Sequence, residues 1–260
     1  MGSPEVIVLN DAAAVAGEAA RRWTRIAQDA VVQRGAFTVA LAGGSTPESL
    51  YHLMARPEFR DAVPWEHTQV FFGDERCVPP SDPRSNYRMA LEALLGRVPL
   101  PRANIFRMRG ELPGWQAAAD YERTLRRVFR APTDELPRFD LILLGMGTDG
   151  HTASLFPGMP ALEVSHSLAV FTDVPHYVNP SVTRITLAFP VLNAASHVLF
   201  LVTGESKAAA ARAALAGSSA PHSTPAGMVR PVCGILTWLL DAGAASLFDI
   251  SATPEDMPSG

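Results

Sequence analysis

The chain has 260 residues, 47% of them hydrophobic, and this length allows either one large α/β domain or two smaller ones. The formal net charge of −4 excludes a chain-wide positive field for nucleic acid, so any bound anion must be held by a local cluster of donors. The two cysteines, Cys77 and Cys233, lie far apart without Cys-x-x-Cys or Cys/His spacing, which argues against a disulfide framework and a zinc site.

The N-terminal segment 1–9 predicts no signal peptide, because no basic region precedes a long apolar one. Nowhere does the sequence approach the roughly 18 consecutive apolar residues of a membrane span. We therefore expect a cytoplasmic protein that binds neither membrane nor nucleic acid.

The first predicted helix is capped by Asn10 or Asp11 and runs to about Gln33, before Gly35. Its buried stripe is predicted to consist of Trp23, Ile26, Ala27, Ala30 and Val31.

Short apolar segments alternate with helical ones along the rest of the chain. Strands are predicted over 37–41, 69–72, 139–144, 184–189 and 197–202. Helices are predicted from Pro47, with Ser45 or Thr46 as the cap, then over 85–95 and 115–130, after Lys207, and over 237–245. This alternation predicts an α/β fold with a mainly parallel twisted sheet and helices on both faces. No repeat or linker interrupts it, so we expect a single domain over residues 1–260, with 217–226 as a surface loop.

Ligands of open α/β sheets bind beyond the carboxyl ends of the strands, and the first such end here is rich in glycine. Gly43-Gly44-Ser45-Thr46-Pro47 follows the strand at 37–41, and the next helix would offer unpaired N–H groups to an anion. An ordinary strand-to-helix turn has the same composition, so this motif alone leaves both interpretations open. It contains neither the Gly-Lys-Ser/Thr of a Walker loop nor a Gly-x-Gly-x-x-Gly fingerprint.

Charged side chains mark three further positions. Gly73-Asp74-Glu75-Arg76 follows a strand and fits either a catalytic site or a structural ion pair. Lys207 starts a helix, where the helix dipole favours anions, so a shared phosphate would explain it. Arg184 starts a strand and is open to the same explanation, although both cations are equally compatible with a solvated surface position.

The sequence Gly145-Met146-Gly147-Thr148-Asp149-Gly150-His151-Thr152 follows an entirely apolar strand. Its glycines clear space around His151, and Asp149 can fix the tautomer of the imidazole and orient it as a general base. The alternative is a capped turn whose histidine binds the backbone, which the position at a strand end disfavours. The other histidines show no spacing of a shared metal site. The residues alone therefore predict an enzyme without metal or cofactor, with a phosphate-sized anion site and a histidine base.

The same motifs, in the same order, resemble those of the 6-phosphogluconolactonases within the glucosamine-6-phosphate isomerase/6-phosphogluconolactonase family. Any one segment is weak evidence, but the ordered set is specific and extends from about residue 5 to residue 248. It consists of residues 41–47, 72–79, 85–87, 144–158, 184–187 and 204–207 together with Asn193. The resemblance implies a fold of the glucosamine-6-phosphate deaminase/ribose-5-phosphate isomerase type.

The resemblance also implies an activity: a carboxylic ester hydrolase that converts 6-phospho-D-glucono-1,5-lactone to 6-phospho-D-gluconate, the second step of the oxidative pentose phosphate pathway, without a cofactor. It implies that His151 activates water, with Asp74, Arg76 and Asp149 around it, and that the phosphate is bound by Gly43, Gly44, Ser45, Thr46, Arg184 and Lys207. A lactone is an activated ester, so one base, one positioned water and donors for the oxyanion suffice. The chain is expected to act as a monomer or a homodimer.

Two other functions fit part of this pattern. Glucosamine-6-phosphate deaminases resemble this chain at the phosphate site and the Asp-Gly-His turn, but they carry a glutamate before the following Pro-Gly, where this chain has Phe156. A non-catalytic sugar-phosphate sensor on the same fold usually carries a basic DNA-binding segment, for which this chain has neither the length nor the charge. Ammonia release from glucosamine 6-phosphate and turnover of the lactone distinguish the three functions.

Overall fold

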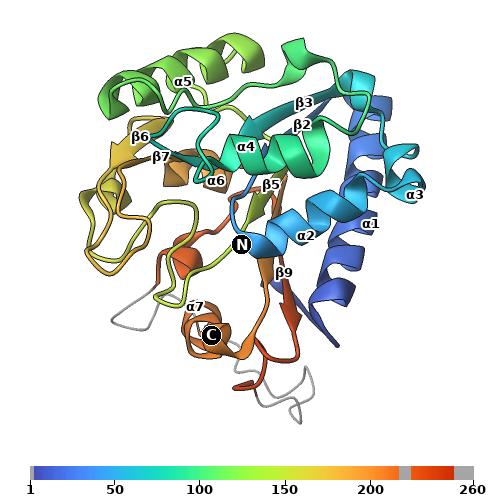
Figure 1. Cartoon of the computed structure of the whole chain (residues 1–260), viewed down its shortest axis with the longest axis vertical. Helices are drawn as coiled ribbons and strands as arrows, with labels where there is room; N and C mark the ends of the chain where they lie inside the picture. Colours follow the sequence, from blue (N-terminus) through green and yellow to red (C-terminus); the bar gives the residue numbers. More distant parts are fainter. Residues whose placement is uncertain (1–2, 217–223, 249–260) are drawn as a thin grey trace.

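The central element of the fold is a six-stranded sheet in which all neighbouring strands are parallel. In the computed structural model, which describes residues 3–216 and 224–248, the strand order is β1-β9-β8-β5-β2-β3 (Figure 1). These strands are β1 (Glu5–Leu9), β9 (Ile235–Asp241), β8 (His197–Val202), β5 (Leu141–Leu144), β2 (Phe37–Leu41) and β3 (Thr68–Phe72). The expected α/β class with a mainly parallel sheet is therefore confirmed.

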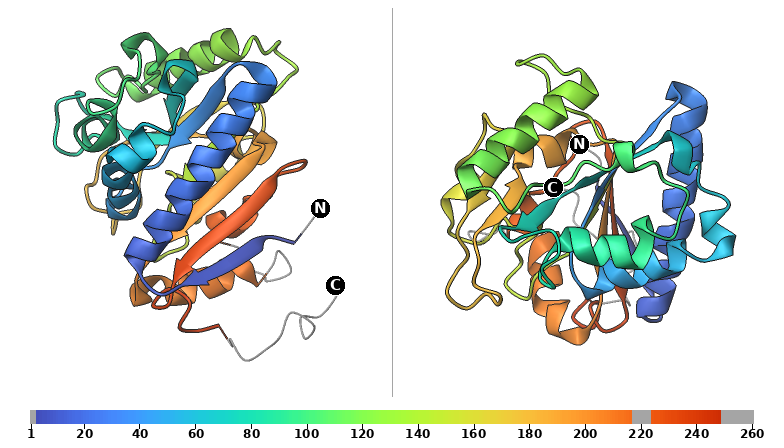
Figure 2. Two further views of the ribbon diagram at one scale, coloured as in Figure 1. Left: turned by 90° about the vertical axis from the view of Figure 1, so that its right-hand side faces the viewer. Right: turned by 45° about the horizontal axis from the view of Figure 1, so that its top comes forward.

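Helices lie on both sides of this sheet. α1 (Ala12–Arg34) and α2 (Ser45–Met54) pack against each other on one side, and α5 (Gly114–Phe129) and α7 (Ala208–Leu215) lie on the other (Figure 2). The remaining helices are α3 (Pro57–Arg60), α4 (Asn86–Ala90), which continues as a π-helical turn over Leu91–Leu95, and α6 (Phe189–Ala194). Short 3-10 turns occur at Trp65–His67, Arg102–Asn104, Pro160–Glu163, Glu205–Lys207 and Pro225–Met228.

The ends of α1 follow from its sequence. Oδ1 of Asp11 accepts a hydrogen bond of 2.8 Å from the backbone N–H of Ala14, which caps the helix. Gly35 ends it in the left-handed region, with a φ of 76°, and its N–H donates to the carbonyl of Val31. Of the predicted stripe, Trp23, Ala27 and Ala30 are buried, while Ile26 and Val31 are partly buried.

A second, smaller sheet supplies one wall of the functional site. It has the antiparallel order β4-β7-β6, with β4 (Asp74–Arg76), β7 (Arg184–Leu187) and β6 (Ala169–Thr172). Only Gly73 separates β4 from β3, so the chain passes directly from one sheet to the other. The strand predicted over 184–189 therefore exists, but it belongs to this antiparallel sheet and ends at Leu187, because Phe189 begins α6.

Some predicted elements are wrong. Residues 237–245 do not form a helix, because 235–241 form β9, a parallel strand between β1 and β8. A strand buried on both faces has no alternation, so its apolar sequence cannot be told from a buried helix. Ser45 and Thr46 do not cap α2, which already begins at Ser45 and has Gly44 in the N-cap position without a side-chain bond. Most of the predicted surface loop, 217–223, lies outside the described residues, and within its remainder Pro225 and Ala226 are buried.

Candidate active site

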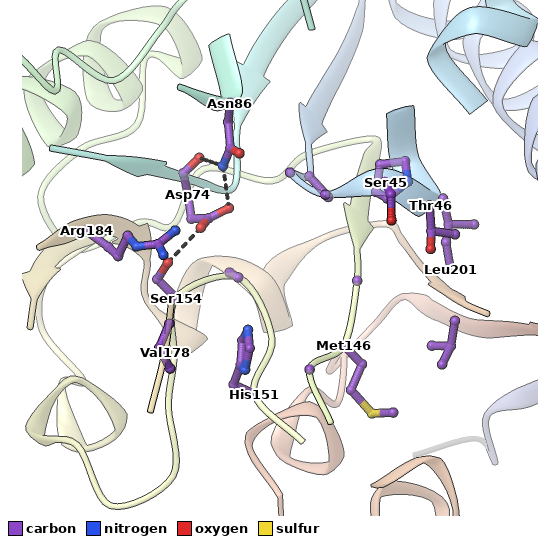
Figure 3. Close-up of a pocket in the computed structure, with 18 of the residues that line it drawn as sticks. Ser45, Thr46, Asp74, Asn86, Met146, His151, Ser154, Val178, Arg184 and Leu201 are labelled. Atoms are coloured by element: carbon purple, nitrogen blue, oxygen red, sulfur yellow. Dashed lines mark hydrogen bonds between the residues drawn. The ribbon is translucent and has the colours of Figure 1, made fainter. Parts of the chain in front are cut away.

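A cavity of about 260 Å³ opens beyond the carboxyl ends of β2, β5 and β8 (Figure 3). The small sheet and the segment before β7 complete its wall. All but one of the residues that the sequence predicted for the site line this cavity, namely Gly43, Gly44, Ser45, Thr46, Asp74, Arg76, His151, Arg184 and Lys207. The exception is Asp149, which does not line the cavity but contacts His151.

The structure brings His151 and Asp149 into direct contact. Nδ1 of His151 lies 2.5 Å from Oδ1 of Asp149, and the same oxygen accepts a bond of 3.1 Å from the backbone N–H of His151. Burial by itself would raise the pKa of Asp149, but its hydrogen bonds and the charge that His151 carries when protonated outweigh burial, so that this pKa is lowered to about 2. An ionised carboxylate only accepts hydrogen bonds, so the neutral imidazole carries its proton on Nδ1 and its lone pair on Nε2. Within the described part of the chain, no hydrogen bond occupies Nε2, and His151 lines the cavity.

The imidazole is confined on two sides. A Cβ on Gly147 would lie 2.1 Å from Nδ1 of His151 and 2.5 Å from Oδ1 of Asp149, so only glycine leaves room for this pair. The N–H of Gly147 also donates a bond of 2.9 Å to the carbonyl of His151, which closes the loop. The ring of Phe156 lies 4.5 Å from the imidazole, centroid to centroid. The position of the imidazole is thus set by a tight loop and an aromatic neighbour.

The start of α2 forms the wall opposite Arg184 (Figure 3). Gly44 has a φ of 99°, a conformation that only glycine adopts without strain, and it turns the chain into the helix. The first N–H groups of a helix have no intrahelical acceptor, so Ser45 and Thr46 can donate to an anion in the cavity. Oγ1 of Thr46 lies 2.8 Å from Oγ1 of Thr203, which connects this wall to the loop after β8.

Three cations border the cavity, and no carboxylate in residues 3–216 or 224–248 forms an ion pair with any of them: Arg76, Arg184 and Lys207. Burial lowers the pKa of Arg184, an effect that Asp74 partly opposes, and Arg76 lowers it further. Arg76 and Arg184 are direct neighbours across β4 and β7, an arrangement of like charges that destabilises a sheet unless an anion is bound. Burial also lowers the pKa of Lys207. This concentration of positive charge, which forms no ion pair among the described residues, suits a phosphate dianion.

Asp74 is held by neighbours rather than by His151. Its carboxylate accepts a bond of 2.6 Å from the hydroxyl of Ser154 and one of 3.1 Å from the amide of Asn86 (Figure 3). The amide oxygen of Asn86 in turn accepts a bond of 2.6 Å from Nη1 of Arg76. Asn86 and Ser154 are not among the site residues predicted from the sequence, because one polar side chain within a motif carries little signal by itself. They hold the carboxylate of Asp74 because α4 and the loop after β5 both pack next to β4.

Glu75 holds the start of α4, which carries Asn86. Its two carboxylate oxygens accept bonds from the backbone N–H groups of Asn86, at 2.7 Å, and Tyr87, at 2.8 Å. These donors and the helix dipole favour the ionised carboxylate, but burial outweighs them and raises the pKa of Glu75. Gly43 allows Asn86 to approach the cavity, since a Cβ there would lie 2.1 Å from its amide oxygen.

In the part of the chain that the structure describes, no group of three or more His, Cys, Asp or Glu side chains is arranged to hold a metal ion. Among the same residues, no helix is long and apolar enough to cross a membrane. Cys77 and Cys233 are both free thiols.

The chain is similar to known proteins over most of its length. The family model described as glucosamine-6-phosphate isomerases/6-phosphogluconolactonase matches residues 10–238. A 6-phosphogluconolactonase of Synechocystis is 43% identical over 222 residues, which is 85% of this chain and 88% of the relative. A probable 6-phosphogluconolactonase 2 of Oryza sativa is 35% identical over 94% of this chain and 90% of its own length.

Solved structures of similar chains agree with the fold. The 6-phosphogluconolactonase from Trypanosoma cruzi superposes with a TM-score of 0.85 at 28% identity, covering 95% of this chain and 97% of its own. A monomeric glucosamine-6-phosphate deaminase superposes with a TM-score of 0.78 at 20% identity, covering 94% and 99% respectively. At that identity the deaminase shows a shared fold alone.

Proposed function

The chain belongs to the glucosamine-6-phosphate isomerase/6-phosphogluconolactonase family, and we propose that it hydrolyses 6-phospho-D-glucono-1,5-lactone to 6-phospho-D-gluconate with a water molecule that His151 activates. Lactone hydrolysis is the activity of its named relatives, and this chain shares it as a carboxylic ester hydrolase. The observation that carries the role of His151 is its contact with Asp149. Because Asp149 binds the Nδ1 proton, the lone pair on Nε2 of His151 remains available to accept a proton, on the wall of a cavity bordered by cations.

The reaction begins when Nε2 of His151 takes a proton from water and the resulting hydroxide attacks the lactone carbonyl carbon. Asp149 stabilises the imidazolium that forms, because its carboxylate is ionised and bound to Nδ1. The carbonyl oxygen becomes an oxyanion, and the guanidinium of Arg76, which lines the cavity, stabilises its charge. When the bond to the ring oxygen breaks, the imidazolium returns its proton to that oxygen, which becomes a hydroxyl group. The oxyanion collapses to the open-chain carboxylic acid, which ionises to the carboxylate by releasing its proton to solvent, and no covalent enzyme intermediate forms.

The phosphate of the substrate binds between the start of α2 and the cations Arg184 and Lys207. Backbone N–H groups of Ser45 and Thr46 donate to its oxygens, and the two cations balance its charge. A bound dianion would also relieve the cost of holding these cations in a partly buried site, where burial lowers the pKa of each. We assign Gly43 and Gly44 to the same site because Gly43 leaves room for the side chain of Asn86 and Gly44, with its positive φ, turns the chain into α2.

Deamination of glucosamine 6-phosphate is not favoured by this site. Ring opening and loss of an amine need further acid/base capacity, and the position where the deaminases carry a glutamate holds Phe156 here. Its ring is buried against the imidazole and cannot exchange protons. An assay for ammonia released from glucosamine 6-phosphate is expected to give no signal above background.

The test of the base is the His151→Ala variant on freshly prepared 6-phosphogluconolactone, with spontaneous hydrolysis subtracted. We expect kcat to fall by about 10²- to 10⁴-fold while KM and the affinity for 6-phosphogluconate stay nearly unchanged. His52→Ala, which removes a half-exposed histidine on α2, is the matched control and should leave kcat unchanged. Near-normal turnover in His151→Ala would eliminate His151 as the base.

We also propose that residues 1–260 work as one domain in the cytoplasm. The cavity takes residues from both sheets, which supports a single functional unit. The two free thiols, one of them exposed, are consistent with a reducing compartment. The substrate is a small phosphorylated lactone, and the chain acts on it as a monomer or a homodimer without contact to nucleic acid.

A further inference from the structure

We propose that Tyr177 is a positioning residue for the reaction: its hydroxyl holds Asp149 in the orientation in which Asp149 supports His151. This inference rests on the proposed role of His151 as the base. Tyr177 lies in the segment between β6 and β7, 28 residues after Asp149, and neither a motif nor the resemblance pointed to it.

Each oxygen of the Asp149 carboxylate has its own partner. Oδ1 accepts from the backbone N–H of His151 and contacts Nδ1 of its ring. Oδ2 accepts a bond of 3.0 Å from the hydroxyl of Tyr177, and within the described chain no other group bonds to this oxygen. A carboxylate that is held at one oxygen can still rotate about the bond to its Cβ. Bonds at both oxygens fix the plane of the carboxylate and therefore the direction from which it meets the imidazole.

Burial does not explain the conformation of Tyr177. Tyr177 is 55% exposed, so its ring gains little from the core, and the centroid of its ring lies 5.6 Å from that of the adjacent His176. The hydroxyl nevertheless reaches inward to Asp149, whose side chain is 20% exposed. A hydrogen bond from a hydroxyl to an ionised carboxylate is stronger than one between neutral groups, and this bond is the evident reason for the orientation.

The segment that carries Tyr177 is tied to the cavity at neighbouring positions. Val178 and Asn179 line the cavity directly, and Figure 3 shows Val178 on the side of Arg184. The carbonyl of Pro180 accepts a bond of 3.1 Å from Nη2 of Arg184. The segment 177–180 thus contacts both Asp149, which binds His151, and Arg184, which is proposed to bind the phosphate. Tyr177 is thereby held where its hydroxyl meets Asp149.

Tyr177→Phe removes the hydroxyl and keeps the ring. We expect kcat on 6-phosphogluconolactone to fall about 3- to 10-fold, with KM and the affinity for 6-phosphogluconate within about twofold of the wild type, because the hydroxyl acts on the base alone. In the Asp149→Asn background, the same substitution should cause no further loss. Thr183→Val is the matched control, because it removes a hydroxyl bond of 3.2 Å to a carboxylate, that of Asp173, in the same segment. It should leave kcat unchanged.

A second measurement reports on the contact without turnover. The proton on Nδ1 of His151, shared over 2.5 Å with Asp149, should give a far-downfield proton NMR signal in the free enzyme. Tyr177→Phe should shift this signal, and Thr183→Val should not. An unshifted signal with normal kcat in Tyr177→Phe would overturn the positioning role. Normal turnover in His151→Ala would instead overturn the base itself, and the two failures are distinguishable because the signal does not depend on catalysis.

Discussion

Replacing Gly147 with alanine would insert a methyl group into the contact between His151 and Asp149. The added Cβ would lie 2.1 Å from Nδ1 of His151, whereas ordinary van der Waals contact begins at 3.4 Å. The imidazole must therefore move away by roughly 1 Å, and misplacement of a catalytic group by about 1 Å costs on the order of 10²-fold in rate. Gly147 does not have a positive φ, so alanine fits its backbone and the protein should fold. We expect kcat to fall by about 10²-fold, with KM nearly unchanged.

The assay is steady-state hydrolysis of fresh 6-phosphogluconolactone, together with thermal unfolding of each variant. Gly145→Ala is the matched comparison: this glycine belongs to the same loop and also lines the cavity, but a Cβ on it meets nothing within 4 Å. Its kcat should stay within about threefold of the wild type, and both variants should keep their melting temperatures within a few degrees. Equal values of kcat for the two variants would refute the argument that Gly147 makes room for the catalytic pair. So would an unchanged Nδ1 proton signal in Gly147→Ala.

Two further predictions concern charge. Lys207→Met and Arg184→Met should each weaken binding of 6-phosphogluconate by about 10-fold or more in calorimetry, and the weaker binding of gluconate should not change, because the lost partner is the phosphate. Equal losses for both ligands would contradict this assignment. The pKa of Asp149 is lowered to about 2 in the folded protein, so its ionised form stabilises the fold above about pH 4, and this contribution disappears as the pH falls through about 2. Asp149→Asn should therefore lower the free energy of unfolding in urea by up to about 2 kcal/mol at pH 7, and by much less near pH 2. A difference that does not depend on pH would refute this reasoning.

The sequence by itself determined which short segments end strands at the edge of the sheet where the cavity lies. Apolar runs that end in glycine and polar residues predicted the strand ends at 43–46, 145–152 and 204–207. Because β2, β5 and β8 are parallel neighbours, their carboxyl ends meet at one edge and their loops line one cavity. The cap at Asp11 and the stop at Gly35 were also predictable, since both depend on interactions within a few residues.

The tertiary structure alone decided how distant residues meet. β9 has a sequence that fits a helix or a strand, and only its place between β1 and β8 makes it a strand. Arg184 reaches the cavity because β7 pairs with β4 in a separate antiparallel sheet, and Tyr177 reaches Asp149 across a gap of 28 residues. Sequence periodicity reports on neighbours along one element, whereas strand order and side-chain contacts between distant segments are set by packing of the whole chain. The residues that line the cavity were therefore largely predictable from the sequence, whereas the contacts between them were not.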